Sequence, residues 1–168
     1  MKGISRIFII MGVSGCGKST IGKMVATALE LPFFDGDDYH SPENVQKMSK
    51  GTPLTDQDRS SWLLRLNALA EEHSDSGAVI ACSALKEKYR NILSKDIKER
   101  TRFIYLKGSF EELTKRMTLR TNHFMPAGLL KSQFETLEPP KDALTVSTEN
   151  PPEIIIEIIL RQLEKPKT

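Results

Sequence analysis

Residues 12–19 read Gly12-Val13-Ser14-Gly15-Cys16-Gly17-Lys18-Ser19, which matches the pattern G-x-x-x-x-G-K-[ST] at every position. The apolar run Ile7–Met11 precedes this stretch, and apolar residues repeat at helical spacing from Ile21 to Leu29 after it. A buried strand, a glycine-rich turn and a helix start in this order indicate a phosphate-binding loop. Its glycines let successive backbone N–H groups turn inward, and the helix start adds free N–H groups and its dipole. A chance glycine-rich turn is the alternative, which the correct flanks disfavour.

Two side chains at the end of this stretch have specific expected roles. Lys18 is predicted to reach the β- and γ-phosphates of a nucleotide, and the Ser19 hydroxyl to ligate Mg²⁺. We assign residues 12–20, including Thr20, to nucleotide binding. The two cysteines, Cys16 and Cys82, have neither the spacing of a metal site nor that of a disulfide framework.

The composition is that of an ordinary globular protein. The 168 residues are 39% hydrophobic and 27% charged, and the formal net charge is only +2. With no run of five basic residues, nothing indicates a nucleic-acid surface. No apolar stretch has the length of a membrane span, and the short N-terminal apolar run leads directly into the loop, so cleaving it as a signal peptide would destroy the site. We expect a cytoplasmic protein with neither nucleic-acid nor membrane partners.

Short apolar runs alternate with helical patterns along the whole chain. This alternation predicts a parallel sheet with right-handed crossovers. The expected fold is α/β, a P-loop NTPase of three layers, α/β/α, with a five-stranded parallel sheet, formed by residues 1–168 as one domain. Ligands then bind at the carboxyl ends of the strands. The predicted strands are residues 7–11, 31–35, 78–82, 103–106 and 144–147.

Acidic residues follow the second predicted strand, in the stretch Asp35-Gly36-Asp37-Asp38. Beside a phosphate loop, one carboxylate can serve the Mg²⁺ shell and another can accept a proton from an attacking hydroxyl. Asp37 is the candidate base because it lies two residues past the strand end, and Asp35 suits the metal side. The alternative is a turn that is simply rich in Asp and Gly. The third strand lacks the acid of a simple Walker B site, so metal binding must rely on Ser19, the phosphates and Asp35.

Several cations follow the acids. Arg59, near the start of the next helix, can grip a carboxylate or a pair of hydroxyls bidentately, although a solvated helix-face arginine is the commoner case. After the third strand, Lys86 and Arg90 could neutralise an acidic substrate. Arg116 and Arg120 lie four residues apart on one helix face.

These two arginines lead into a predicted mobile lid at approximately residues 118–130, which also contains His123. Arginines on a closing lid would stabilise the charge of a transferring phosphoryl group and exclude water. An exposed helix end is the alternative for the arginines, and a solvated histidine for His123. We place the adenine pocket near Arg116 and residues 148–151.

The chain resembles the gluconokinases of the small P-loop type, nearly from end to end. The resemblance rests on the phosphate loop and on four further stretches. These are residues 34–44, residues 51–62, residues 81–90, and the lid region with Arg120, residues 123–124 and residues 133–139. It implies ATP-dependent phosphorylation of D-gluconate at the 6-hydroxyl, an NMP-kinase-like fold with a lid, and a homodimer.

The resemblance also implies roles for individual residues. Asp37 would activate the 6-hydroxyl, and Arg120 would clamp the phosphates. The gluconate pocket would be lined by His40, Arg59, Lys86, Arg90 and His123. A pocket with several cations and one base suits a small polyol carboxylate better than a nucleobase, which needs a stacking aromatic.

Other small-molecule kinases are the nearest alternative. A shikimate kinase would share the fold and the acidic stretch, but it is expected to carry a glycine triplet where this chain has Cys82-Ser83-Ala84. A nucleoside monophosphate kinase is less favoured. A guanine-nucleotide switch predicts an Asn-Lys-x-Asp motif, which is absent from the sequence. A nucleic-acid-end kinase predicts a basic, aromatic-rich surface.

Overall fold

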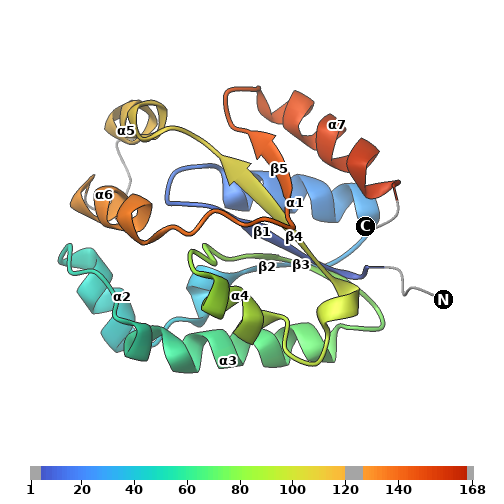
Figure 1. Ribbon diagram of the computed structural model, residues 1–168, viewed down its shortest axis with the longest axis horizontal. Coiled ribbons are helices and arrows are strands. Elements are labelled where there is room, and N and C mark those ends of the chain that lie inside the picture. The colour runs from blue at the N-terminus through green and yellow to red at the C-terminus, as the bar shows by residue number, and fades with distance from the viewer. Residues whose placement is uncertain (1–4, 120–126, 166–168) are drawn as a thin grey trace.

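The computed structural model describes residues 5–119 and 127–165. Its centre is a parallel sheet with the strand order β2-β3-β1-β4-β5 (Figure 1). The predicted five-stranded parallel sheet is therefore confirmed. The strands are β1 (Ile7–Met11), β2 (Phe33–Asp35), β3 (Ala78–Ala81), β4 (Thr101–Lys107) and β5 (Leu144–Ser147).

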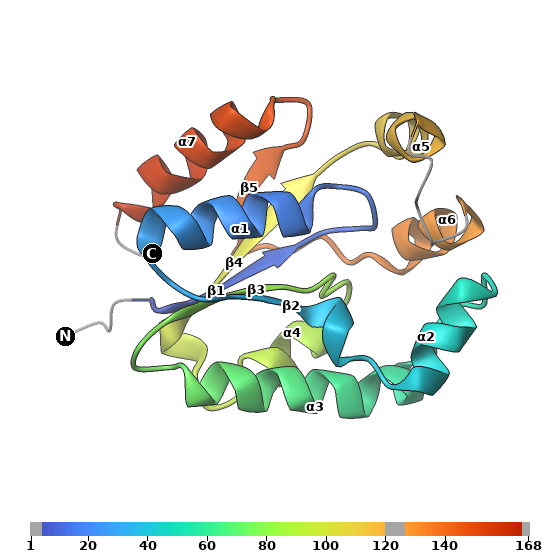
Figure 2. The same cartoon turned by 180° about the vertical axis from the view of Figure 1, so that it is seen from behind.

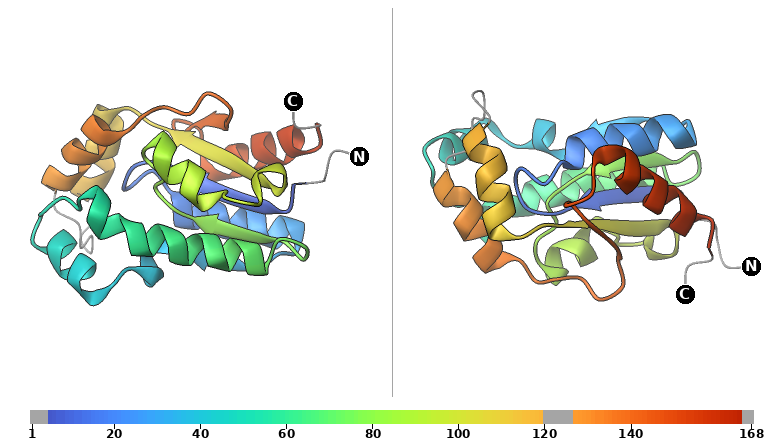
Figure 3. Two further views of the ribbon diagram at one scale, coloured as in Figure 1. Left: turned by 60° about the horizontal axis from the view of Figure 1, so that its bottom comes forward. Right: turned by 90° about the horizontal axis from the view of Figure 1, so that it is seen from above.

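Helices cover both faces of the sheet, which confirms the predicted three layers. On one face lie α1 (Lys18–Leu29) and α7 (Pro152–Leu163), and on the other α3 (Asp56–Glu72) and α4 (Glu87–Leu93) (Figure 2). Three further helices gather beyond the carboxyl ends of the strands, on the side of the phosphate loop and away from both termini (Figure 3). They are α2 (Pro42–Ser49), α5 (Phe110–Leu119) and α6 (Ala127–Thr136).

β1 occupies the middle of the sheet because every one of its side chains is apolar. All five residues are buried, and Ile9 pairs with Ile80 of β3 on one side and with Phe103 of β4 on the other. A strand that is covered on both faces needs a continuous apolar run rather than an alternating one. This central position delivers the loop that follows β1 to the middle of the carboxyl edge.

Three strands differ from their predicted bounds, and one of them, β3, only ends one residue earlier, at Ala81. β2 begins at Phe33 rather than at Leu31, and β4 begins at Thr101 rather than at Phe103. The added residues of β4 pair with the start of β1, and the Thr101 hydroxyl donates a hydrogen bond of 2.8 Å to the carbonyl of Ile97. A polar side chain satisfied in this way is compatible with burial, but it interrupts the apolar run on which the prediction rested.

The sequences Thr55–Asp58 and Ser109–Glu112 have the pattern of a capping box, which predicts a helix start at each. The box at Thr55 and Asp58 is present in both directions. At α5, the Ser109 hydroxyl accepts the N–H of Glu112 at 3.1 Å, as expected. The carboxylate of Glu112, however, accepts a hydrogen bond from Thr148 and pairs with Arg116. This helix start is thereby tied to the loop after β5.

The predicted lid lies partly outside the described residues. Residues 120–126, which include Arg120 and His123, are not described, whereas α6 at the end of the predicted lid is. Within the described part of the chain, no helix combines the length and the apolarity needed to cross a membrane.

Candidate active site

The loop between β1 and α1 has the backbone geometry of a phosphate cradle. Gly12, Gly15 and Gly17 have φ angles of 147°, 79° and 97°, a region that favours glycine. The loop ends at Gly17, which is the N-cap of α1, so that the free N–H groups of the helix start face the same space. Lys18 and Ser19 are the first two residues of α1 and lie at this opening.

Gly12 has no room for a side chain. A Cβ added there would lie 2.7 Å from Cys16 Sγ and 2.9 Å from the Leu106 carbonyl oxygen. Cys16 is itself buried, and burial raises the pKa of its thiol. The thiol therefore stays protonated and fills the space beneath the loop.

We expect Gly12→Ala to lose more stability than Gly17→Ala. Both substitutions place alanine at a positive φ, which costs about 1–3 kcal/mol, but a Cβ at Gly17 would meet nothing within 4 Å. The collision at Gly12 adds an overpacking cost of roughly 1–3 kcal/mol. Urea unfolding of the two variants measures the difference, and equal losses would show that the loop relaxes around the new methyl group.

The side chains predicted to hold phosphate and metal are already held by protein oxygens. Lys18 Nζ donates a hydrogen bond of 3.0 Å to the Val13 carbonyl, so the ammonium group lies over the loop. Ser19 Oγ donates to Asp35 Oδ2 at 2.7 Å. The two predicted metal ligands are thus brought together, and hydroxyl and carboxylate oxygens are the ligands that Mg²⁺ prefers.

Asp37 lies in the 3₁₀ turn Gly36–Tyr39 that follows β2, where its N–H donates to Asp35 Oδ1 at 3.0 Å. Partial removal from solvent raises the pKa of its carboxyl, the negative charges of Asp35 and Asp38 add to this, and Lys18 opposes it. The side chain remains 58% exposed, so water still screens these effects. A raised pKa makes the carboxylate a better proton acceptor.

His40 is neutral at physiological pH. Burial lowers its pKa to about 4, and the positive charge of Arg59 adds to the effect. Asn44 Nδ2 lies 3.4 Å from His40 Nδ1, and because an amide NH₂ group only donates, Nδ1 is the acceptor. The ring proton is therefore on Nε2, which lies 4.0 Å from Asp37 Oδ1. The neutral imidazole thus lies beside the candidate base, beyond hydrogen-bond distance.

Trp62 of α3 fixes this part of the site. Its Nε1 donates a hydrogen bond of 2.7 Å to the Gly36 carbonyl, and its ring stacks on His40 with centroids 4.0 Å apart. The hydrogen bond anchors the turn that carries Asp37, because a buried indole N–H requires a partner. The position of the candidate base is therefore set by the core.

One pocket, which we call the loop pocket, joins the phosphate loop to the acidic turn. It brings together five of the predicted site residues, Ser14, Lys18, Asp37, His40 and Arg59. The remaining lining residues are Met48, Pro53, Leu54, Trp62, Ser83, Ser132 and Gln133. An ammonium, a carboxylate and a guanidinium thus share one small polar space.

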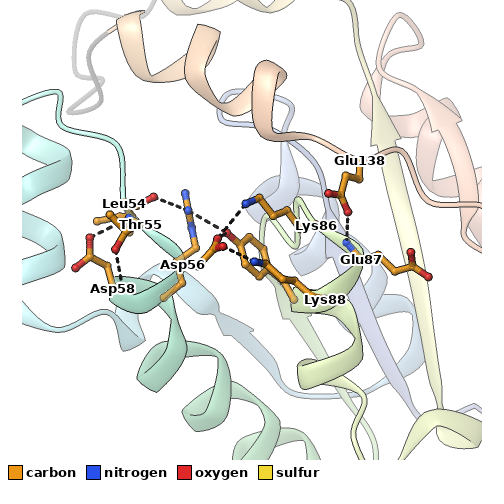
Figure 4. Close-up of polar contacts among 10 residues, drawn as sticks. Leu54, Thr55, Asp56, Asp58, Lys86, Glu87, Lys88 and Glu138 are labelled. Atoms are coloured by element: carbon orange, nitrogen blue, oxygen red, sulfur yellow. Dashed lines mark hydrogen bonds and ion pairs between the residues drawn. The ribbon is translucent and has the colours of Figure 1, made fainter.

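Arg59 is held in place by polar residues behind the loop pocket. We call this set the outer layer, and it consists of Tyr89, Asp56, Lys86 and Lys88. Arg59 Nη1 donates to the Leu54 carbonyl at 2.6 Å and to the Tyr89 hydroxyl at 3.3 Å. The Tyr89 hydroxyl in turn donates to Asp56, which also pairs with Lys86 and Lys88 (Figure 4). These donors keep the pKa of the Asp56 carboxyl low. Lys86 therefore lies outside the lining of the loop pocket and belongs to this outer layer.

Arg90 is buried and is bound to the backbone. Its guanidinium donates to the carbonyls of Ala84, at 2.7 Å, and Glu138, at 2.9 Å. Ala84 has a φ of 47°, which is unfavourable for a residue with a Cβ. Arg90 thereby supports the turn after β3 that places Ser83 in the loop pocket.

Arg116 contacts the segment predicted to lie near the adenine. It donates to the Thr148 carbonyl and pairs with Glu112 at 2.8 Å. The predicted proximity of Arg116 to residues 148–151 is therefore present in the structure.

A larger groove lies at the other end of the sheet, away from the phosphate loop. It is lined by residues from the starts of β1 and β4, by the segment before β5 and by the end of α7. Arg90 is the only predicted site residue among its lining residues that the structure describes. Its charges are mixed, and we assign no function to it.

Gln133, Ser83 and Asp56 were not among the predicted site residues. Each reaches the site through the fold rather than through a local motif. The pattern Thr55-Asp56-Gln57-Asp58 reads only as a capping box, and Ser83 reads only as a small residue after a strand. For Gln133, the resemblance of residues 133–139 is the one signal that could have drawn attention to it.

Comparison with known proteins agrees with this geometry. The family model described as shikimate kinase matches residues 14–144. The chain is 48% identical to the thermosensitive gluconokinase of Escherichia coli over 137 residues, which cover 80% of this chain and 72% of that protein. It is 43% identical to the gluconokinase of Gluconobacter oxydans over 164 residues, with 95% and 92% covered.

The crystal structure of a gluconokinase from Sinorhizobium meliloti superposes with a TM-score of 0.85 at 41% identity, covering 96% of this chain and 93% of that one. These last two matches cover 95% and 96% of the chain, and so include the phosphate loop, the acidic turn and the outer layer. The chain therefore belongs to the shikimate kinase family in the broad sense of the matching model, and within it to the gluconokinases.

Proposed function

We propose that this chain is an ATP-dependent gluconokinase that transfers the γ-phosphoryl group of ATP to the 6-hydroxyl of D-gluconate. The observation that carries the proposal is the loop pocket, where the phosphate-loop lysine and a carboxylate with a raised pKa line the same space. A base beside a phosphate cradle is the arrangement that phosphoryl transfer to an alcohol requires. The gluconokinase relatives support the choice of acceptor.

The residues of the pocket divide the work. Asp37 takes the proton of the attacking 6-hydroxyl. The oxygen of this hydroxyl then bonds to the γ-phosphorus, and the bond between that phosphorus and the leaving ADP breaks. Lys18 leaves the Val13 carbonyl for the β- and γ-phosphates. The neutral His40 lies beside Asp37 and adds no positive charge there. Arg59 is placed to bind the carboxylate or hydroxyl groups of gluconate, with Arg120, His123 and Arg116 as further proposed contacts.

The metal would be held by Ser19 and Asp35. Their oxygen atoms are hard ligands already in contact, at 2.7 Å, and a single carboxylate beside substrate phosphates is the usual Mg²⁺ environment. Bound there, Mg²⁺ would neutralise developing phosphate charge. We further propose a mobile lid near residues 118–130, a cytoplasmic location and a homodimer. A mass in solution of twice 18.9 kDa would support the dimer.

An acceptor panel tests the proposal. We expect ADP release from Mg-ATP, followed with a coupled assay, to depend on gluconate and to be far slower with other sugar acids, shikimate, nucleoside monophosphates or water. Mass spectrometry of the product should show one added phosphoryl group. Turnover with shikimate instead would keep the chemistry and reject the acceptor, and ADP release that is independent of any acceptor would reject the kinase.

Shikimate is the second candidate acceptor because the shikimate kinase model matches the chain. The expected glycine triplet is replaced by residues 82–84, and the structure places Ser83 of this stretch in the loop pocket. A hydroxyl at this position suits a polyol acceptor, which favours gluconate.

A further inference from the structure

A glutamine that is distant in sequence from the phosphate loop binds to it. Gln133 of α6 accepts the backbone N–H of Ser14 on Oε1 at 2.7 Å, and its Nε2 donates to Ser14 Oγ at 3.1 Å. Because a backbone N–H can only donate, the amide oxygen must face it, which fixes the orientation of the carboxamide. Gln133 therefore forms hydrogen bonds with both the backbone and the side chain of Ser14.

The Ser14 N–H belongs to the set of donors that a phosphate loop offers to its ligand. In this structure the neutral amide oxygen of Gln133 accepts it. Lys18 is bound in a similar way, because its ammonium group donates a hydrogen bond to the Val13 carbonyl. Gln133 and Lys18 both line the loop pocket together with Asp37. A protein oxygen thus stands at each of two donors where phosphate oxygens are expected.

We infer that Gln133 is a catalytic residue that contacts the transferred phosphoryl group, an assignment that rests on the proposed function. Phosphate oxygens are charged acceptors, and hydrogen bonds to them are roughly twice as strong as neutral ones. The γ-phosphate therefore takes the Ser14 N–H from Gln133 Oε1. The carboxamide then turns its N–H group toward the phosphate, where negative charge spreads during transfer.

The residue type fits these two tasks. In the observed contact the side chain accepts from a backbone N–H, and in the proposed contact it donates to a phosphate oxygen. A lysine or arginine cannot accept, and a glutamate cannot donate when ionised. A carboxamide does both by rotating about its last side-chain bond.

Three variants test the assignment. Gln133→Met keeps the size and loses both hydrogen bonds, Gln133→Glu keeps the acceptor and adds a negative charge, and Glu135→Gln, at an exposed position of the same helix, is the control. For each we measure the Kd of Mg-ADP and of a non-hydrolysable Mg-ATP analogue by calorimetry, kcat and KM for gluconate, and the Tm.

For Gln133→Met we expect kcat to fall about 10²-fold, as for the loss of one preorganised donor, while KM for gluconate and the Kd of ADP change less than about threefold. For Gln133→Glu we expect the ratio of the analogue Kd to the ADP Kd to rise at least about tenfold, because the added carboxylate repels only the γ-phosphate. Glu135→Gln should match the wild type in every measurement.

Other results would overturn the assignment. Equal weakening of ADP and analogue by Gln133→Glu would make the residue a support of the whole loop. A raised KM for gluconate at unchanged kcat would make it an acceptor contact, and unchanged kinetics would make it neither. The Kd ratio uses nucleotides alone, so it decides the assignment even if gluconate supports no turnover, in which case the proposed function fails by itself.

Discussion

Asp37→Asn is expected to remove nearly all gluconate phosphorylation while leaving the fold and ATP binding intact. The amide fills the same space but cannot take the proton of the attacking hydroxyl, so kcat should fall by about 10²–10⁴-fold, the usual contribution of a general base. Lys18 and the loop are unchanged, so the Kd of Mg-ATP should stay within about threefold of the wild type. Kinetics with a coupled ADP assay and calorimetry with an ATP analogue measure the two effects.

The pH dependence gives the same assignment a second readout. The base must be ionised, so in the wild type kcat/KM should rise as the pH increases through the raised pKa of Asp37 and then level off. The residual activity of Asp37→Asn should lack this rise. Asp38→Asn, at the exposed neighbour in the same turn, should keep this rise and move it to lower pH, because the charge of Asp38 adds to the raised pKa of Asp37. An Asp37→Asn enzyme with near-normal kcat would reject Asp37 as the base.

As the pH rises, the ionisation of Asp37 should lower the stability of the fold while it raises the activity. A carboxyl whose folded pKa is raised binds more protons in the folded state than in the unfolded state, so its effect on stability is absent below the unfolded pKa. Stability is then lost as the pH rises from the unfolded to the folded pKa. Removing the charge relieves this loss, and the Tm of Asp37→Asn at neutral pH should equal or exceed that of the wild type.

Local patterns were sufficient to predict the elements that build the site. β1 is a continuous apolar run, the loop is a complete motif, and Thr55 and Asp58 form a capping box, so each is specified by neighbouring residues. For the same reason Ser19 and Asp35 were correctly expected on the same side: parallel strands end at one edge. The start of β4 was misplaced because Thr101 is polar and is satisfied by a contact that no periodicity reveals.

Side-chain partners that come from distant segments could not be predicted. Lys86 and Arg90 were both expected to face the acceptor, since spacing puts them after a strand end. The structure pairs Lys86 with Asp56 and binds Arg90 to two backbone carbonyls. A long cationic side chain reaches several partners from one helix position, and only the packing of α3 against α4 selects among them. The contact of Gln133 with Ser14 spans 119 positions of sequence and is likewise a product of topology.

Lys18→Met is expected to remove turnover more completely than any other single change in the loop. The ammonium group is the one side-chain cation that the G-x-x-x-x-G-K-[ST] motif supplies to the β- and γ-phosphates. Methionine keeps most of the volume and loses the charge. The lost stabilisation grows as charge develops during transfer, so kcat/KM should fall at least about 10³-fold, at the upper end of the effect of one preorganised donor. The coupled assay at saturating gluconate measures it.

The variant should fold because Lys18 contributes little to the packing. Its described hydrogen bond goes to the Val13 carbonyl, and its side chain is only partly buried, so the Tm should shift by no more than a few degrees. Lys23→Met provides the control: Lys23 is an exposed lysine of the same helix, near the ring of Phe33, and should retain full activity. If Lys18→Met kept more than a tenth of wild-type kcat/KM, the loop would bind phosphate through its backbone alone. The transition-state charge would then have to be met by other cations, with Arg59 of the loop pocket the first to be examined.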